Sequence, residues 1–192
     1  MLLIGVLFIC ATILLSSSAM ADDGVLPGPI FTAIMLKPLN YDRNIDRQAK
    51  DKVVIGIVNS SDDAAGQGFS VQVKDNIDKA QSTYLLKDKS VEDNVLLTLE
   101  KAFDKAKFEE QLKQANISIL VVDENDTSSV NNILEATKEL QINSICGNPG
   151  CAQNGVGLEK DNKPHMLINL NSAKQEGSDY DSKFLAMCEI VK

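Results

Sequence analysis

The 192-residue chain contains no tryptophan and a single histidine, and these absences exclude several kinds of site. A structural zinc site takes four nitrogen or sulfur ligands, and His165 is the only imidazole available to join the cysteines. No glycine-rich phosphate-binding motif is present, so no nucleotide cofactor is predicted. The chain has 19 basic and 27 acidic residues, and the resulting net charge of −8 argues against a nucleic-acid partner. We predict no metal, no cofactor and no enzymatic activity.

The first 21 residues have the composition of a secretory signal. Residues 2–15 are almost wholly apolar and uncharged, and Ala19-Met20-Ala21 places small residues before a cleavage point. We predict cleavage after Ala21, a leader loop over residues 22–28 and a periplasmic location. An uncleaved membrane anchor is the alternative, because no lysine or arginine precedes the apolar run.

Three cysteines remain beyond this segment, and two of them flank a turn-rich stretch, "CGNPGC". Nearby thiols in an exported chain usually form a disulfide, and residues 147–150 are of the types that allow a tight reversal. We predict that Cys146 and Cys151 form a disulfide that closes a surface loop. Cys188 follows Phe184 and Leu185 on an expected helix, which predicts a buried thiol without a reactive role. A thiol-dependent enzyme or redox sensor is the minor alternative.

The rest of the chain alternates buried strands with amphipathic helices. Runs rich in β-branched residues at 53–58 and 117–122 predict central parallel strands. Helical spacing predicts helices from about Ile30, with a break at Pro38, and over 66–81, 103–115, 126–141 and 178–192. Residues 95–103 read as strand or mixed structure, and we expect a short strand at 142–146 and two strands around a turn at 161–163. This order predicts an α/β fold, a single compact domain with a mostly parallel central sheet flanked by helices.

Two polar groups stand out against this framework. Asn59, Ser60 and Ser61 directly follow the first buried strand, where ligands bind in open α/β sheets, although a turn and helix cap would use the same residues. Tyr41, Asp42 and Arg43 predict a hydrogen-bonded structural cluster against the sheet. Clustered acids such as Asp123, Glu124 and Asp126 do not match a calcium-loop spacing and are expected to be solvated or to cap helices.

The last third of the chain resembles the YfiR-like family of small periplasmic proteins. The matching features are a glycine strand, a Lys-Pro step before an Ile-Asn-Leu strand, an Ala-Lys-x-x-Gly turn and a final Leu-Ala step: Gly155, Gly157, Lys163, Pro164, Ile168, Asn169, Leu170, Ala173, Lys174, Gly177, Leu185 and Ala186. With the earlier Tyr-Asp-Arg-Asn and Val-Val-Ile-Gly-Ile-Val stretches, the resemblance covers residues 29–192. It implies an α/β fold and a non-catalytic role.

Two functions follow as hypotheses. The resemblance implies an exported regulator that binds a protein partner, an inner-membrane signalling protein such as a diguanylate cyclase through its periplasmic part. The alternative is a periplasmic domain that binds a small anion or solute at Asn59, Ser60 and Ser61. The sequence leaves the oligomeric state open, with a homodimer as one option.

Overall fold

The protein was analysed as a computed structural model, and its secondary structure follows the predicted alternation closely. The structure describes residues 26–49, 52–60, 64–80, 85–86, 89–99, 103–123, 127–147, 155–160 and 164–191. The signal sequence predicted over residues 1–21 lies outside these ranges. Within them, no helix combines the length and the apolar character that a membrane span requires.

The helices and strands alternate along most of the chain. In chain order they are α1 (Gly28–Met35), the 3-10 helix η1 (Pro38–Tyr41), α2 (Ile45–Ala49), β1 (Val53–Ser60), α3 (Ala64–Ala80), β2 (Leu85–Leu86), β3 (Lys89–Leu99), α4 (Lys105–Gln114), β4 (Ile119–Asp123), α5 (Thr127–Leu140), β5 (Asn143–Cys146), β6 (Val156–Lys160), β7 (Pro164–Asn169), α6 (Leu170–Gln175), α7 (Ser182–Leu185) and β8 (Glu189–Val191).

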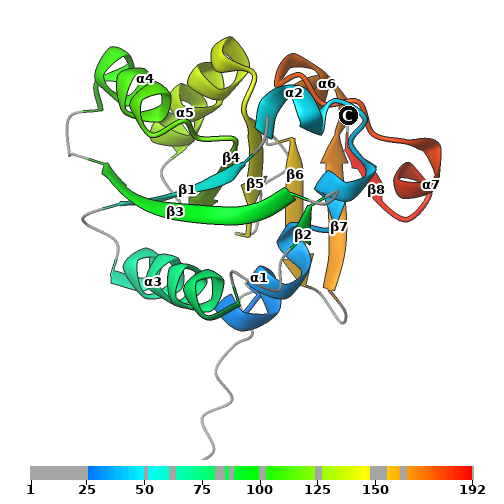
Figure 1. The fold of residues 1–192 in the computed structure, drawn as a ribbon, viewed down its shortest axis with the longest axis horizontal. Helices are drawn as coiled ribbons and strands as arrows, with labels where there is room; N and C mark the ends of the chain where they lie inside the picture. Colours follow the sequence, from blue (N-terminus) through cyan, green and yellow to red (C-terminus); the bar gives the residue numbers. More distant parts are fainter. Residues whose placement is uncertain are drawn as a thin grey trace, which may run out of the picture.

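The described strands form one sheet in the order β2-β3-β1-β4-β5-β6-β7-β8. The five strands from β3 to β6 in this order are parallel to one another, β2 pairs antiparallel with β3, β7 pairs antiparallel with β6, and β8 pairs parallel with β7. Figure 1 shows α1 and α3 on one face of the sheet and α4 and α5 on the other. The predicted α/β fold with a mostly parallel sheet is therefore confirmed.

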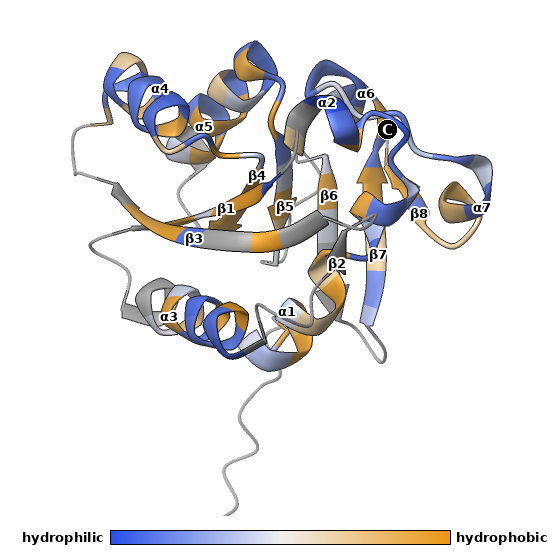
Figure 2. Ribbon diagram, in the orientation of Figure 1, coloured by the Kyte–Doolittle hydropathy of each residue, from blue (hydrophilic) through white to orange (hydrophobic). Residues whose placement is uncertain are grey.

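Side-chain alternation along the central strands builds a hydrophobic core on each face. In β4, Ile119 and Val121 point to the α1/α3 side, while Leu120 and Val122 point to the α4/α5 side, and all four are completely buried. This arrangement explains why the strand reads as a continuous apolar run. The helices direct their apolar stripes to these cores and their charged residues outward, as the hydropathy colours in Figure 2 show.

The end of the chain differs from the sequence-based expectation. A helix was predicted over residues 178–192, but only Ser182–Leu185 is helical, and Glu189–Val191 forms the edge strand β8, parallel to β7. The helical prediction was wrong because Ile190 and Val191 are β-branched residues that reach the open edge of β7, where strand pairing satisfies their backbone. The short helix α6 after β7 was also not predicted.

The segment at 41–44 is joined to the segment at 177–181 by a buried carboxylate. Asp42 is fully buried, and its Oδ1 accepts hydrogen bonds from the backbone N–H groups of Asn44 (2.9 Å) and Asp179 (2.8 Å). Its Oδ2 accepts from Asn143 Nδ2 at 3.2 Å. The ring of Tyr41 stacks on Phe184, with centroids 5.2 Å apart. We refer to this joint between residues 41–44 and 177–181 as the clasp.

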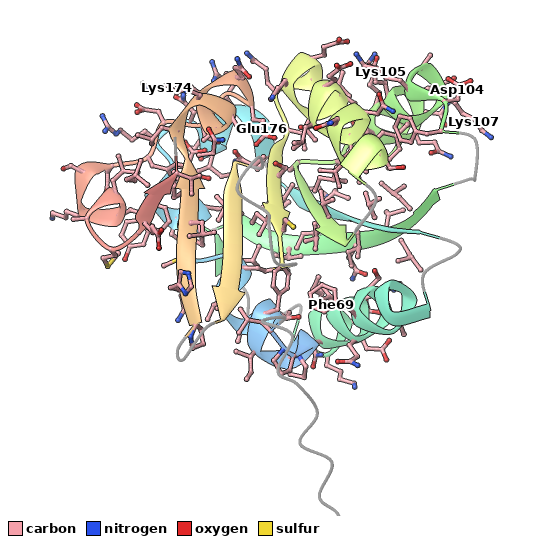
Figure 3. All side chains as sticks on the ribbon, turned by 180° about the vertical axis from the view of Figure 1, so that it is seen from behind. Phe69, Asp104, Lys105, Lys107, Lys174 and Glu176 are labelled. Carbon is pink, nitrogen blue, oxygen red and sulfur yellow. The ribbon has the colours of Figure 1, made fainter. Side chains whose placement is uncertain are left out.

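Glu176, a second fully buried carboxyl group, lies next to the clasp. Figure 3 shows its side chain pointing inward from the end of α6. Its Oε2 accepts the N–H of Ser144 at 3.0 Å, and its Oε1 lies 2.6 Å from Ser144 Oγ and 2.8 Å from Thr137 Oγ1. Ser144 Oγ in turn accepts the N–H of Gly155. A Cβ at Gly155 would lie 2.4 Å from Glu176 Oε2, so a side chain at this position would have to displace the Glu176 carboxyl group from its hydrogen bonds.

The hydrogen count in this cluster suits a protonated Glu176. Thr137 has one hydroxyl hydrogen, but its Oγ1 is within hydrogen-bond distance of both Leu134 O (3.0 Å) and Glu176 Oε1 (2.8 Å). If Glu176 carries a proton, it donates to Thr137, and Thr137 donates to Leu134. Burial raises the pKa of Glu176 to about 7, and the hydrogen bonds from Ser144 and Thr137 and the charge of Lys138 oppose this rise only in part.

We predict that Glu176 makes stability fall as the pH rises through neutrality. In the unfolded chain the pKa of this carboxyl group is near 4.5. Its protonation therefore stabilises the folded state fully below that pH, and this contribution to the free energy of unfolding is lost as the pH rises from there through about 7. Urea unfolding of Glu176→Gln between pH 5 and 8 should lack this fall, which is on the order of 3 kcal/mol. Glu110→Gln, at an exposed site on α4, is the control and should follow the wild-type curve. Parallel curves for wild type and Glu176→Gln would contradict the assignment.

Candidate functional site

The candidate site lies at the carboxyl ends of the parallel strands, where the strand order reverses. The chain leaves β1, passes through α3 and adds β3 on one side, and it then crosses through α4 to add β4 on the other side of β1. At such a switch point the neighbouring connections diverge to opposite faces and leave a crevice beyond the strand ends. We refer to the space beyond the ends of β1 and β4, where this rule places a crevice, as the switch-point crevice.

The ends of β1 and β4 bring polar residues together at this crevice. Asn59 of β1 is in register with Asp123 of β4 and with Thr98 of β3, and Ser60 is the last residue of β1. Two of the three predicted ligand-binding residues, Asn59 and Ser60, therefore have their backbone at the switch point. Ser61 lies outside the described residues.

Asp123 was not predicted as part of this site. The sequence analysis assigned it to solvated or capping acids, but its register with Asn59 places it at the crevice. The signal was present in the sequence, because Asp123 directly follows the second buried apolar run just as Asn59 follows the first. Only the strand order, which makes β1 and β4 neighbours, could connect the two positions.

Two helices begin beside the crevice on opposite faces of the sheet. α3 starts at Ala64, shortly after β1, and α5 starts at Thr127, shortly after β4. The N-terminal end of a helix carries unpaired N–H groups and a partial positive charge. This combination favours an anionic group of a ligand at the same edge of the sheet.

A buried aromatic pair packs against the backbone directly after β5. Phe31 of α1 and Phe69 of α3 pack edge to face, with ring centroids 5.1 Å apart. Figure 3 shows Phe69 where α3 borders α1. A Cβ at Gly147, directly after β5, would lie 2.8 Å from the ring of Phe31 and 2.9 Å from Phe69. The backbone at Gly147 therefore packs directly on both rings.

The cysteine loop starts at the same edge of the sheet. Cys146, the last residue of β5, is buried and disulfide-bonded. Its predicted partner Cys151 lies outside the described residues, so this pairing stays a prediction. Cys188 is a half-buried free thiol whose Sγ lies 3.3 Å from Phe184 O, and burial raises its pKa to about 11. A thiol with this pKa is protonated at neutral pH and is a poor nucleophile.

The predicted cluster of Tyr41, Asp42 and Arg43 lies far from the crevice, in the clasp. Its hydrogen bonds end on backbone groups and side chains of the fold, and the Arg43–Asp179 ion pair (3.6 Å) is exposed. Among the residues that the structure describes, no group of three or more histidine, cysteine or acidic side chains is placed to hold a metal ion. The switch-point crevice is thus the place where the described residues combine polar strand ends, helix N-termini and aromatic rings.

Comparison with known proteins gave structural neighbours only. No family model matches the chain, and no curated protein matches it in sequence. A conserved domain protein from Vibrio cholerae has a similar fold, with a TM-score of 0.59 and 13% identity over 86% of this chain and 60% of its own.

Of two further neighbours, one was solved with a bound ligand and the other is named as a substrate-binding protein. An ABC domain from Streptococcus pneumoniae, solved in complex with L-Trp, has a TM-score of 0.52 and 11% identity, covering 81% of this chain and 60% of its own. A substrate-binding protein with adhesive properties from Clostridium difficile, in its ligand-free open form, has a TM-score of 0.51 and 11% identity, covering 78% and 57%. The chain spans less than two thirds of each neighbour, and identities this low establish the α/β fold alone.

We predict that Gly147→Ala destabilises the protein, because the added methyl group must displace Phe31 or Phe69 from a close-packed contact. The expected loss in the free energy of unfolding is about 1–3 kcal/mol, as for other overpacked sites. Gly68→Ala is a matched control, since a Cβ at Gly68 in α3 meets no atom within 4 Å. There the helix propensity of alanine should stabilise the protein by up to about 1 kcal/mol. Urea unfolding measures both; an equally stable Gly147→Ala would show that the backbone does not pack on the rings.

Proposed function

We propose that the chain is an exported, non-catalytic domain that binds a small solute in the switch-point crevice. The observation that carries the proposal is the strand order β3-β1-β4-β5, which brings Asn59, Ser60 and Asp123 to the one edge where α3 and α5 both begin. Ligands of open α/β sheets bind at this position. Two structural neighbours support the proposal: one is named as a substrate-binding protein, and the other was solved in complex with L-Trp.

The chemistry of the crevice favours a small organic anion. Helix N-termini stabilise a carboxylate or phosphate, Asn59 and Ser60 are of types that donate hydrogen bonds to such groups, and Asp123, whose charge disfavours a second anion, is of a type that pairs with the ammonium group of a zwitterion. Phe31 and Phe69 supply an apolar border near the end of β5. A ligand that unites a carboxylate with an apolar body, such as an amino acid, matches both features.

The proposal predicts stabilisation by a specific solute. A thermal-shift panel of amino acids, small carboxylates, phosphate, sulfate and sugars should contain a solute that raises the Tm, because a ligand at 100 times its Kd adds about 2.7 kcal/mol to the free energy of unfolding. Asn59→Ala and Ser60→Ala should abolish the shift, while the control Asn131→Ala, on the exposed side of α5, should keep it. A panel without any response, or variants that respond like wild type, would refute the proposal.

Our second proposal is that the chain binds a protein partner, and the open edge of strand β8 is the surface that favours it. β8 is the last strand of the described sheet and pairs only with β7 there, and the exposed Met187 and Ile190 lie next to its open edge. An edge strand without a protecting lysine or proline can accept a strand from another chain. The resemblance to YfiR-like proteins points to the periplasmic part of a membrane signalling protein as the kind of partner.

The partner proposal predicts a complex that depends on β8. Size-exclusion chromatography with the periplasmic domain of a membrane diguanylate cyclase from the same organism should show co-elution. Ile190→Lys should abolish it, because a buried ammonium group costs several kcal/mol. Val71→Lys, at an equally exposed apolar site on α3, should not. Separate elution of the wild-type proteins would count against this proposal and leave solute binding untouched.

A further inference from the structure

A second cavity lies at the opposite edge of the sheet, where β1, β4 and β5 begin. Its volume is about 520 Å³, within the range of small-molecule sites. Val54, Ser118 and Ile142 border it at the amino ends of these strands, and the last turns of α4 and α5 form its walls. The cavity is therefore separated from the switch-point crevice by the length of the strands.

The ends of α4 and α5 shape this cavity in the same way. The N–H of Ile117 donates to Leu112 O (3.0 Å), and the N–H of Ile142 donates to Thr137 O (2.9 Å). Both turns pass through a left-handed residue, Asn116 (φ 51°) or Gln141 (φ 54°). These are Schellman caps, which satisfy the last helical carbonyls and turn the chain sharply into the next strand. The walls of the cavity are thus held by backbone hydrogen bonds.

The lining is apolar but incompletely covered. Leu112, Ile117 and Ile142 are buried, whereas Val54, Ala115 and Leu140 pack against the core and remain partly exposed. Apolar surface that faces a cavity gains free energy when an apolar ligand removes it from water. The lining therefore offers a contact surface for a small apolar body.

The polar groups of the lining carry one sign of charge. Lys52 and Lys113 border the cavity with Asn116 and Ser118, and none of the described lining residues is acidic. Lys113 Nζ lies 3.8 Å from a carboxylate oxygen of Glu109 outside the lining, a long pair in which the lysine side chain is 60% exposed and the glutamate side chain 16%. In a chain with a net charge of −8, the charged side chains of this lining are both positive.

From this arrangement we infer that the cavity binds a small amphiphile with a single anionic group, of the class of medium-chain or aromatic carboxylic acids. The apolar body lies on Val54, Ala115 and Leu140, and the anionic group reaches the ammonium groups of Lys52 and Lys113. The site is distinct from the crevice at Asn59 and does not rest on the function proposed there.

Octanoate, octan-1-ol and acetate are suitable probes. Octanoate carries both the apolar body and the anionic group, octan-1-ol carries only the apolar body, and acetate carries only the anionic group. Isothermal titration and methyl NMR shifts of the full chain should show that octanoate binds and that acetate does not. Octanol should bind about tenfold more weakly than octanoate, a difference of about 1.4 kcal/mol. Methyl shifts should be confined to Val54, Leu112, Ala115, Ile117, Leu140 and Ile142.

Variants separate the cavity from other apolar surface. Ala115→Leu fills the cavity and should lower octanoate affinity by at least about tenfold, while Ala106→Leu on the exposed side of α4 should not. The double variant Lys52→Met/Lys113→Met alters only exposed positions and should bind octanoate and octanol equally. Lys183→Met, at an exposed site away from the cavity, is its control and should keep the preference for octanoate.

Asn59→Ala should bind octanoate like wild type, which separates this site from the crevice.

Three results would overturn the inference. They are no octanoate binding at millimolar concentration, unchanged affinity in Ala115→Leu, and an unchanged preference for octanoate in the double lysine variant.

Discussion

The first two residues of β5 hold the two buried carboxyl groups found among the described residues, and the arrangement of the C-terminal half depends on these contacts. Asn143 donates to Asp42, and Ser144 donates to Glu176 through its N–H and its hydroxyl. A buried carboxyl group without such donors would cost several kcal/mol. β5 is therefore fixed in register between the segment before β1 and the helix after β7, and β6 joins through the Gly155 N–H.

The two edges of the sheet consequently have different characters. At the amino edge, the clasp, the Glu176 cluster and the Schellman caps of α4 and α5 satisfy the backbone and hold the connections tightly. At the carboxyl edge, polar strand ends at Asn59 and Asp123 meet two helix N-termini. The amino edge thus supports the fold through satisfied polar groups, whereas the carboxyl edge is the side on which open α/β sheets bind their ligands.

The sequence predicted what local periodicity encodes and missed what depends on distant pairing. The runs at 53–58 and 117–122 became β1 and β4 because both faces of these strands are buried, which leaves an unmistakable apolar pattern. β8 was read as helix, because its pairing with β7 is invisible in a window of three residues. Asp42 was recognised as part of a cluster, but its partners Asn143 and Asp179 lie 101 and 137 residues away, and Asp123 gained its place at the crevice only through strand order.

The clasp also sets the moment at which the chain can complete its fold. Asp42 receives its donors from Asn143 and Asp179, so a nascent chain carries this carboxylate without its partners until nearly the whole sequence has been synthesised. Segments that must close such long loops form late, because the entropy of loop closure opposes them until other contacts are in place. The joint between residues 41–44 and 177–181 can therefore form only after the segment at 177–181 has been synthesised, although the central strands can pair before it.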